Sequence, residues 1–152
     1  MISIERLRDI REDKDYNQEY ISKLIKVSRT QYSMYECGVR LIPANKLVTL
    51  AIFYKVSTDY LLNLTNERKK YKTTNNVYST ENIKMLRKNK KLKQEDIANL
   101  LKTTQEQYSR YERGVRIIPI DRLSILAEYY NVSIDYLVGL TNERKPYPKV
   151  KH

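Results

Sequence analysis

The chain has 152 residues, 41% of them hydrophobic, and 29 lysines and arginines against 18 acidic residues give it a net charge of +11. This length suits one ordinary domain or two small ones with a packed core. The positive charge either simply solvates the surface or favours a polyanionic partner, nucleic acid or an anionic membrane. No apolar run could span a membrane or serve as a signal peptide, and one cysteine and one histidine offer neither an internal disulfide nor metal-ligand spacing. We expect a cytoplasmic protein without metal or cofactor.

The chain contains the same unit twice. A shift of 76 residues aligns 7–71 with 83–147, and about half of the aligned positions are identical. The segment QYSMYECGVRLIP at 31–43 returns as QYSRYERGVRIIP at 107–119, and LTNERK occurs at both 64–69 and 140–145. A unit of about 65 residues is near the lower size limit for a domain that folds alone.

These boundaries predict four parts: a first domain over 1–69, a linker over 70–80, a second domain over 81–145 and a basic tail over 146–152. The linker reads KYKTTNNVYST, which is polar and has no helical period. As a flexible chain it would average roughly 17–20 Å from end to end.

Each copy predicts five short helices, read most clearly in the second copy. Ile83 and Leu86 share a face of the first helix, and residues 94–101 form the second. Thr104 is a suitable N-cap for the third helix, and Gly114 is the residue type expected to stop it.

The fourth and fifth helices follow directly. Pro119 suits the first turn of the fourth helix. Its apolar side chains recur at helical spacing, at Leu123, Leu126, Ala127 and Tyr130. Ser133 can cap the fifth helix, with Asp135 in its first turn, where the helix dipole favours an acid. Strand-like alternation is missing from the sequence, so the expected fold class is all-α.

These residues resemble the helix-turn-helix domains of phage repressors and Cro proteins, the XRE-like family. The pattern begins with an arginine on the first helix and Gln-Glu opening the second. It continues with S/T-x-x-Q-Y-S-x-Y-E-x-G over the third helix and V-S-x-D-Y-L at the end. The resemblance implies two lambda-repressor-like five-helix domains in tandem. It also implies a non-enzymatic, sequence-specific regulator of transcription that binds double-stranded DNA and is most often a repressor.

The chain departs from the family pattern at the turn between the second and third helices, where Lys26 and Lys102 replace the usual glycine. A lysine can adopt the left-handed conformation at a cost of about 1–2 kcal/mol. It also places a positive charge near the DNA backbone.

The third helix of such a domain enters the major groove. Helical geometry turns its first, second and sixth positions outward and its fourth, seventh and eighth positions toward the body. The inward positions are Tyr32, Tyr35, Glu36, Tyr108, Tyr111 and Glu112. The resemblance makes the following residues base-facing: Arg29, Thr30, Gln31, Met34, Gln105, Glu106, Gln107 and Arg110.

A second group is expected to contact phosphates, which positions a protein on DNA without reading its sequence. Its members are Gln18, Lys26, Ser33, Arg40, Gln94, Lys102, Ser109, Arg113 and Arg116. The resemblance further implies structural ion pairs between the first and third helices, Arg11–Glu36 and Arg87–Glu112. These glutamates are therefore not interpreted as catalytic acids.

The two copies are expected to be unequal readers. Residues 1–71 hold 13 basic and 9 acidic residues, whereas residues 72–152 hold 16 and 9. Arg110 can bond guanine and Gln105 adenine in bidentate fashion, whereas Met34 offers only an apolar contact. We expect the second copy to supply most of the affinity, with the first copy reading weakly or serving as a docking surface.

The sequence leaves open how the protein assembles and what else it binds. The two copies could imitate a dimer on two half-sites, or each chain could form a homodimer through the fifth helix around Tyr136 and Leu137. A protein-interaction module such as an antitoxin is the alternative function, although only the linker and the short tail could hold a partner-binding segment. No effector site is evident in the sequence.

Overall fold

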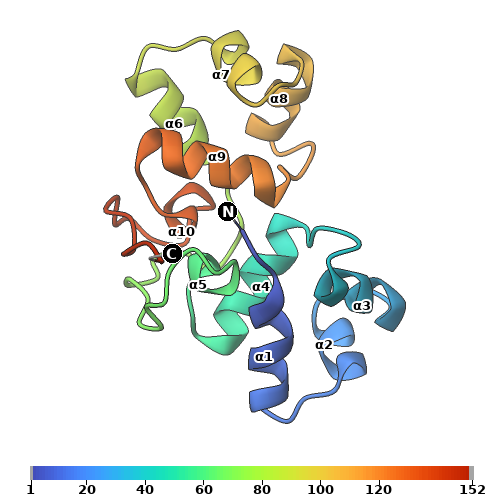
Figure 1. Ribbon diagram of the computed structural model, residues 1–152. Coiled ribbons are helices and arrows are strands. Elements are labelled where there is room, and N and C mark those ends of the chain that lie inside the picture. Colours follow the sequence, from blue (N-terminus) through green and yellow to red (C-terminus); the bar gives the residue numbers. More distant parts are fainter. Residues whose placement is uncertain (1, 151–152) are drawn as a thin grey trace.

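Residues 2–150 are described in the computed structural model, and within them the chain folds into ten helices (Figure 1). The helices of the first copy are α1 (Glu5–Asp13), α2 (Gln18–Leu24), α3 (Arg29–Cys37), α4 (Ala44–Tyr54) and α5 (Thr58–Leu61). Those of the second copy are α6 (Glu81–Asn89), α7 (Gln94–Leu100), α8 (Gln105–Glu112), α9 (Ile120–Tyr130) and α10 (Ile134–Leu137). Over the described range the backbone forms no strand, only an isolated bridge between Thr73 and Thr141. The all-α class and the five helices per copy are confirmed.

Local capping explains where the third helices begin. The Ser28 hydroxyl accepts a hydrogen bond from the Gln31 backbone N–H at the start of α3, and Thr104 does the same for Gln107 at the start of α8. Such caps satisfy backbone donors that have no partner within the helix. A glycine with positive φ follows each helix end, Gly38 at 76° and Gly114 at 73°.

Both turn lysines adopt the left-handed conformation that the sequence predicted. Lys26 has φ of 60° and Lys102 has φ of 57°, and both side chains are exposed. The packed turn between the second and third helices therefore imposes on a lysine a backbone geometry that glycine adopts without strain.

The fourth helices of the two copies line the middle of the molecule. Leu123 and Leu126 are fully buried on α9, as are Leu47 and Leu50 on α4 to within 1%. Pro119 is the N-cap of α9 rather than a first-turn residue, so the helix begins one residue later than expected. Buried side chains of both copies belong to one continuous hydrophobic cluster.

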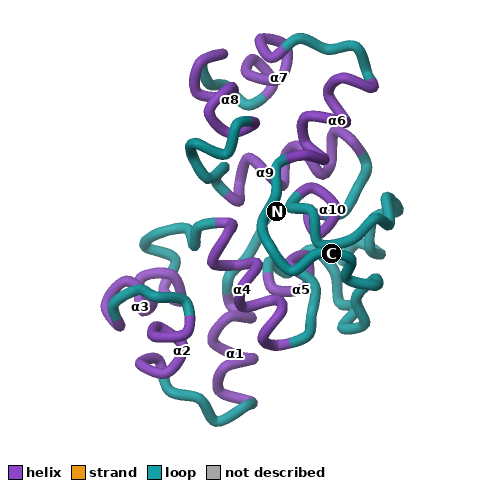
Figure 2. Tube along the Cα trace, turned by 180° about the vertical axis from the view of Figure 1, so that it is seen from behind, coloured by secondary structure: helices purple, strands orange, loops and turns teal. Residues whose placement is uncertain are grey.

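The two copies meet through their short fifth helices, α5 and α10, which pack against each other. Tyr136 and Leu137 on α10 are 3% and 0% exposed, so the face that a homodimer could have used is covered within the chain. Figures 1 and 2 show α3 and α8 on one side of the molecule and the loops after α5 and α10 on the other.

The segment expected to be a flexible linker is ordered against the second copy. The Thr74 N–H donates to the Leu140 carbonyl over 2.8 Å, and the Ser79 N–H donates to the Val138 carbonyl over 2.9 Å. The polar segment thus finds backbone partners on the second copy, which its composition could not show. Of the predicted tail, residues 151–152 lie outside the described residues, and Tyr147 is buried.

Candidate nucleic-acid interface

Helices α3 and α8 divide into a buried face and an outer face, as the sequence predicted. On α3, Tyr32 and Tyr35 are 1% and 5% exposed, and on α8, Tyr108 and Tyr111 are 0% and 2% exposed. A base-stacking role for these four tyrosines is therefore excluded, because their rings are part of the core. The outer face of α3 holds exposed Arg29 and Thr30 and half-buried Met34; that of α8 holds exposed Gln105 and Glu106 and half-buried Arg110.

Each third helix is fixed to the first helix of its copy by a buried, two-point ion pair. Arg11 Nε donates to Glu36 Oε1 over 2.6 Å, and Arg11 Nη2 donates to Glu36 Oε2 over 3.1 Å. The second copy repeats the arrangement, with 2.6 Å and 3.0 Å between Arg87 and Glu112. Both predicted ion pairs are confirmed, and their fork-like geometry fixes the orientation of the helix as well as its distance.

A glutamine from the second helix completes each pair. Gln18 Nε2 donates to Glu36 Oε2 over 3.0 Å, and Gln94 Nε2 donates to Glu112 Oε1 over 3.3 Å. Burial alone would raise the pKa of Glu36, but hydrogen bonds from Arg11 and Gln18 outweigh it and lower the pKa below the ordinary value. The same balance, with Arg87 as the first hydrogen-bond donor, lowers the pKa of Glu112. Both glutamates are therefore charged at neutral pH and act as structural anchors.

A shallow depression on the first copy brings several predicted contact residues together at the junction of α2 and α3. Its lining comprises Gln18, Arg29, Thr30, Ser33, Met34, Cys37 and Val39. The first five belong to the predicted site. Cys37 and Val39 were not predicted, and Cys37 is an exposed free thiol at the end of α3.

The missed valine has an exact counterpart in the second copy. Val39 and Val115 are 71% and 65% exposed, although valine normally prefers the interior. Each follows the helix-ending glycine and precedes an exposed arginine, Arg40 or Arg116. Their presence in the repeated thirteen-residue segment is the sequence signal that could have identified them.

The predicted base-facing glutamines are partly engaged within their own helices. Gln31 Oε1 accepts from the Ser28 backbone N–H over 3.4 Å, which completes a capping box. Gln107 is half-buried, and its Nε2 donates to the Tyr111 hydroxyl over 3.2 Å. Helix capping and internal bonding are thus observed for these two side chains.

The outer face of α8 is richer in charge than that of α3. Arg110 Nη2 lies 2.9 Å from Glu106 Oε1, a one-turn ion pair on the helix surface. Arg113 Nε donates to Ser109 Oγ over 3.3 Å and lies at the end of the same helix. The positions equivalent to Arg110 and Arg113 are Met34 and Cys37, so α3 has an apolar surface where α8 is cationic.

The described residues were also compared with the requirements of a metal site and of a membrane-spanning helix. Within residues 2–150, no group of three or more histidine, cysteine, aspartate or glutamate side chains could hold a metal ion. Over the same range, no helix is long and apolar enough to cross a membrane.

Comparison with known proteins assigns the fold to a family. A family described as helix-turn-helix domain matches residues 4–67, and a second, described as helix-turn-helix, matches residues 83–137. The chain therefore carries two helix-turn-helix domains in tandem, of the XRE type that its sequence resembles. These domains are DNA-binding modules of transcription regulation.

Individual relatives agree with this assignment. The uncharacterized HTH-type transcriptional regulator YobD of Bacillus subtilis is 39% identical over 71 residues, which are 47% of this chain and 62% of that protein. The uncharacterized HTH-type transcriptional regulator YqaE of the same organism is 39% identical over 66 residues, 43% of this chain and 57% of that protein. The chain thus covers less than two thirds of the length of either relative, and each match is about as long as one copy.

Among solved structures, a transcriptional regulator from Listeria innocua is 38% identical to the matched part of the chain. The match covers 42% of this chain and 60% of that one, with a TM-score of 0.40.

Proposed function

We propose that this protein represses transcription by binding double-stranded DNA in a sequence-specific manner. Helix α3, helix α8 or both would enter the major groove and read base edges, and a bound promoter would be closed to polymerase. The observation that carries the proposal is the placement of α3 and α8 on the same side of the molecule (Figures 1 and 2). Both helices have exposed polar side chains, Arg29 and Thr30 on α3 and Gln105 and Glu106 on α8. The protein would act in the cytoplasm without a cofactor.

The proposed division of labour follows the exposure of the side chains. Arg29, Thr30 and Met34 of α3 and Gln105 and Arg110 of α8 would face bases. Phosphates would be held by Gln18 and Gln94, by the turn lysines, by Ser33 and Ser109, and by the arginines Arg40, Arg113 and Arg116. The second copy would supply most of the affinity because its outer face holds Arg110 and Arg113.

The test is the selection of random double-stranded DNA by the purified full chain, followed by titration of an enriched duplex at two salt concentrations. We expect a defined motif and an affinity that falls steeply with salt, because each neutralised phosphate releases counterions. Arg110→Ala should weaken binding, whereas Lys84→Ala, an exposed lysine on α6, should leave it unchanged. If no duplex were enriched, the proposal would be contradicted.

The protein-interaction alternative needs a free segment for a partner. Hydrogen bonds of Thr74, Ser79, Tyr147 and Val150 instead hold the linker and residues 146–150 to the two copies. The described residues therefore offer no observation that favours an antitoxin-like role.

A further inference from the structure

The contact between α5 and α10 contains an exchange of aspartates between the two copies. Asp59 of α5 accepts hydrogen bonds from the backbone N–H groups of Ile134 and Asp135, over 2.9 and 3.1 Å. In return, Asp135 Oδ1 accepts from the backbone N–H of Thr58 over 2.8 Å and from its hydroxyl over 2.6 Å. Each copy thus supplies the carboxylate that caps the first turn of the other copy's last helix.

This exchange replaces the role that the sequence assigned to Asp135. The acid was expected to interact with the dipole of its own helix, but its carboxylate is directed to the N-terminus of α5. The N-terminal N–H groups of a helix have no partner inside the helix and attract negative charge. A carboxylate from outside therefore satisfies them, and here both outside carboxylates come from the opposite copy.

The pattern has the symmetry of a dimer. The shift of 76 residues that aligns the copies maps Thr58 onto Ile134 and Asp59 onto Asp135. An interface in which residue i contacts j and j contacts i is the hallmark of two-fold association between identical subunits. Within this one chain, the same relation joins two covalently linked copies.

The contact is buried as deeply as a protein core. Asp59 and Asp135 are 5% and 2% exposed, and Leu61 and Leu137 beside them are both fully buried. Buried carboxylates are stabilised only when their oxygens are hydrogen-bonded, and each of the four oxygens of this pair accepts at least one hydrogen bond. A loose encounter between two independent domains would leave these groups in water.

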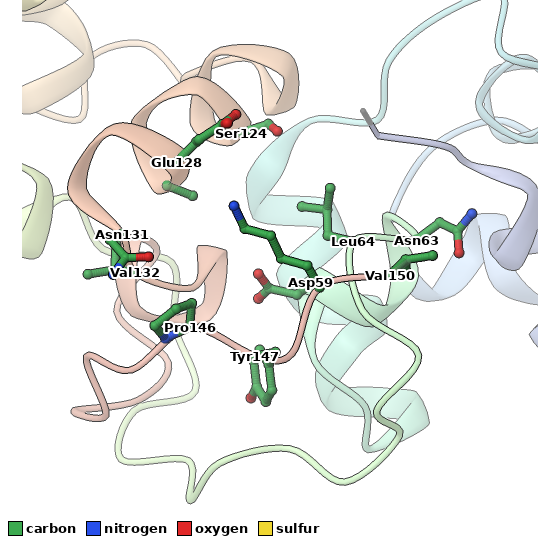
Figure 3. Close-up of a pocket in the computed structure, with 12 residues that line it drawn as sticks. Asp59, Asn63, Leu64, Ser124, Glu128, Asn131, Val132, Pro146, Tyr147 and Val150 are labelled. Carbon is green, nitrogen blue, oxygen red and sulfur yellow. The ribbon is translucent and has the colours of Figure 1, made fainter. Parts of the chain in front are cut away.

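Two tyrosines close the contact from the side opposite to α3 and α8. Tyr147 donates its hydroxyl proton to Asp135 Oδ2 over 2.9 Å and accepts from the backbone N–H of Tyr71 over 2.9 Å. The rings of Tyr71 and Tyr147, which the 76-residue shift also aligns, stack with centroids 4.2 Å apart. The chain then continues to Val150, whose N–H donates to the carbonyl of Leu64 in the first copy (Figure 3).

The two halves of the contact are not identical. Thr58 supplies a hydroxyl donor to Asp135, whereas its counterpart Ile134 supplies none to Asp59. Tyr147 likewise donates its hydroxyl proton to Asp135, whereas its counterpart Tyr71 donates to the Pro146 carbonyl. Two second copies placed together would have isoleucine on both sides and would lose the threonine hydroxyl bond. The contact is therefore asymmetric, because only the side on which Thr58 lies has a hydroxyl bond to the aspartate.

We infer that a single chain is an internally assembled dimer that reads two unlike half-sites of one duplex, with α3 on one and α8 on the other. This inference rests on the proposed function. Helix-turn-helix dimers place their readers on half-sites about 34–36 Å apart, one helical turn of DNA. Because the outer faces of α3 and α8 differ at Met34 and Arg110, the DNA partner is a non-palindromic pair of half-sites at a fixed spacing.

The first experiment measures stoichiometry and spacing with the full chain on a duplex enriched from random DNA. We expect one chain per duplex by native mass spectrometry. Inserting about 5 base pairs between the half-sites turns one of them to the opposite face and should lower the affinity by about 10²- to 10⁴-fold, to that of one half-site. An insertion of about 10 base pairs returns both half-sites to the same face of the duplex but moves them one helical turn further apart. A protein whose two recognition helices are held at a fixed separation should lose affinity for this duplex as well.

The outcomes separate this inference from the proposed function. Two chains on a palindrome, or an affinity insensitive to both insertions, would overturn the inference and leave the function standing. If no duplex were enriched, both would fall.

A variant then links the spacing requirement to the aspartate exchange. Asp135→Asn should reduce the penalty of the 5-base-pair insertion at least tenfold, because it weakens the bonds to Thr58 and Tyr147 that fix the orientation of the copies. Asp121→Asn, an exposed acid on α9, is the matched control and should keep the full penalty. An unchanged spacing penalty in a folded Asp135→Asn protein would contradict the role of the exchange, and the spacing series on the unaltered chain decides the rest if this variant does not fold.

Discussion

Helices α3 and α8 occupy equivalent places in the two copies and differ in an instructive way. Their buried positions are the same residue types, two tyrosines and a glutamate, held by the same arginine and glutamine. Their outer positions differ, most clearly at Met34 and Arg110. Packing and buried charge therefore constrain one face of the helix, whereas the other face is free to change with what it meets.

The largest loss of stability should come from changes on the buried face of α3 and α8, which is the same in both copies. Glu36→Ala and Glu112→Ala, made separately, should each destabilise the protein by about 3–5 kcal/mol, because each leaves a buried arginine without its partner. Urea unfolding measures the loss, and Glu95→Ala, at an exposed position of α7, is the control. If either variant were no less stable than the control, the two copies would not share this anchor.

The contact between the copies should make stability depend on pH. Burial and the nearby charge of Asp135 raise the pKa of Asp59 to about 7, and burial also raises the pKa of Asp135 against the effects of Thr58, Tyr147 and Lys70. A raised carboxyl pKa means that the folded state holds a proton which the unfolded state releases. The free energy of unfolding should therefore fall as pH rises from about 4 to about 7, by at most about 1.4 kcal/mol per pH unit for one proton.

The anchor glutamates act in the opposite direction and at lower pH. Their lowered pKa means that the stability they contribute is lost as pH falls below the ordinary glutamate value. Denaturant titrations at several pH values, compared with Asp59→Asn, isolate the contribution of the aspartate exchange. A difference between the two proteins that did not shrink with rising pH would contradict this assignment.

The outer faces should differ in their contribution to DNA binding. Arg110→Ala should weaken binding to the enriched duplex by about 1–3 kcal/mol if the guanidinium bonds a guanine, and Met34→Ala by less. Titrations of both variants, with Lys84→Ala as control, measure the difference. Equal losses at the two positions would show that the copies read DNA alike.

The stacked tyrosines allow a finer comparison, because Tyr71 and Tyr147 are equivalent in the repeat but not in their bonds. Tyr147→Phe leaves the buried Asp135 Oδ2 and the Tyr71 N–H without a partner and should lower stability by about 1–2 kcal/mol. Tyr71→Phe removes a single bond to the Pro146 carbonyl and should have a smaller effect. Thermal and urea unfolding measure both losses. A larger loss for Tyr71→Phe than for Tyr147→Phe would contradict this assignment.

The smallest effect concerns the turn lysines. Lys26→Gly and Lys102→Gly relieve a left-handed backbone and should raise stability by up to about 1 kcal/mol. Lys23→Gly lies inside α2 and should lower stability by about 1 kcal/mol instead. A loss of stability in the two turn variants would mean that the lysine side chains contribute more than their backbone strain takes away.

Much of the fold was predictable because its determinants are local or repeated. The caps Ser133 and Thr104, the stop at Gly114 and the apolar spacing of α9 lie within a few residues of what they control. The repeat also doubled every signal, which made the ion pairs of Arg11 and Arg87 predictable from the resemblance.

The contact between the copies was not predictable, because its partners are 75 to 77 residues apart in the chain. Asp135 fitted its own helix dipole, so nothing local pointed to Thr58. The linker composition also gave no sign of the backbone bonds made by Thr74 and Ser79. Sequence patterns report which groups are able to bond, whereas the pairing of distant groups depends on how the copies pack.

A single chain, as we infer, presents two unlike recognition helices, α3 and α8, at a fixed separation. Hydroxyl-radical footprinting of the full chain on a duplex enriched from random DNA tests it most directly. We predict two protected patches on one face of the duplex, about one helical turn apart, that cover different sequences and appear at the same protein concentration. A single protected patch, or two patches with the same sequence that fill at different concentrations, would contradict it.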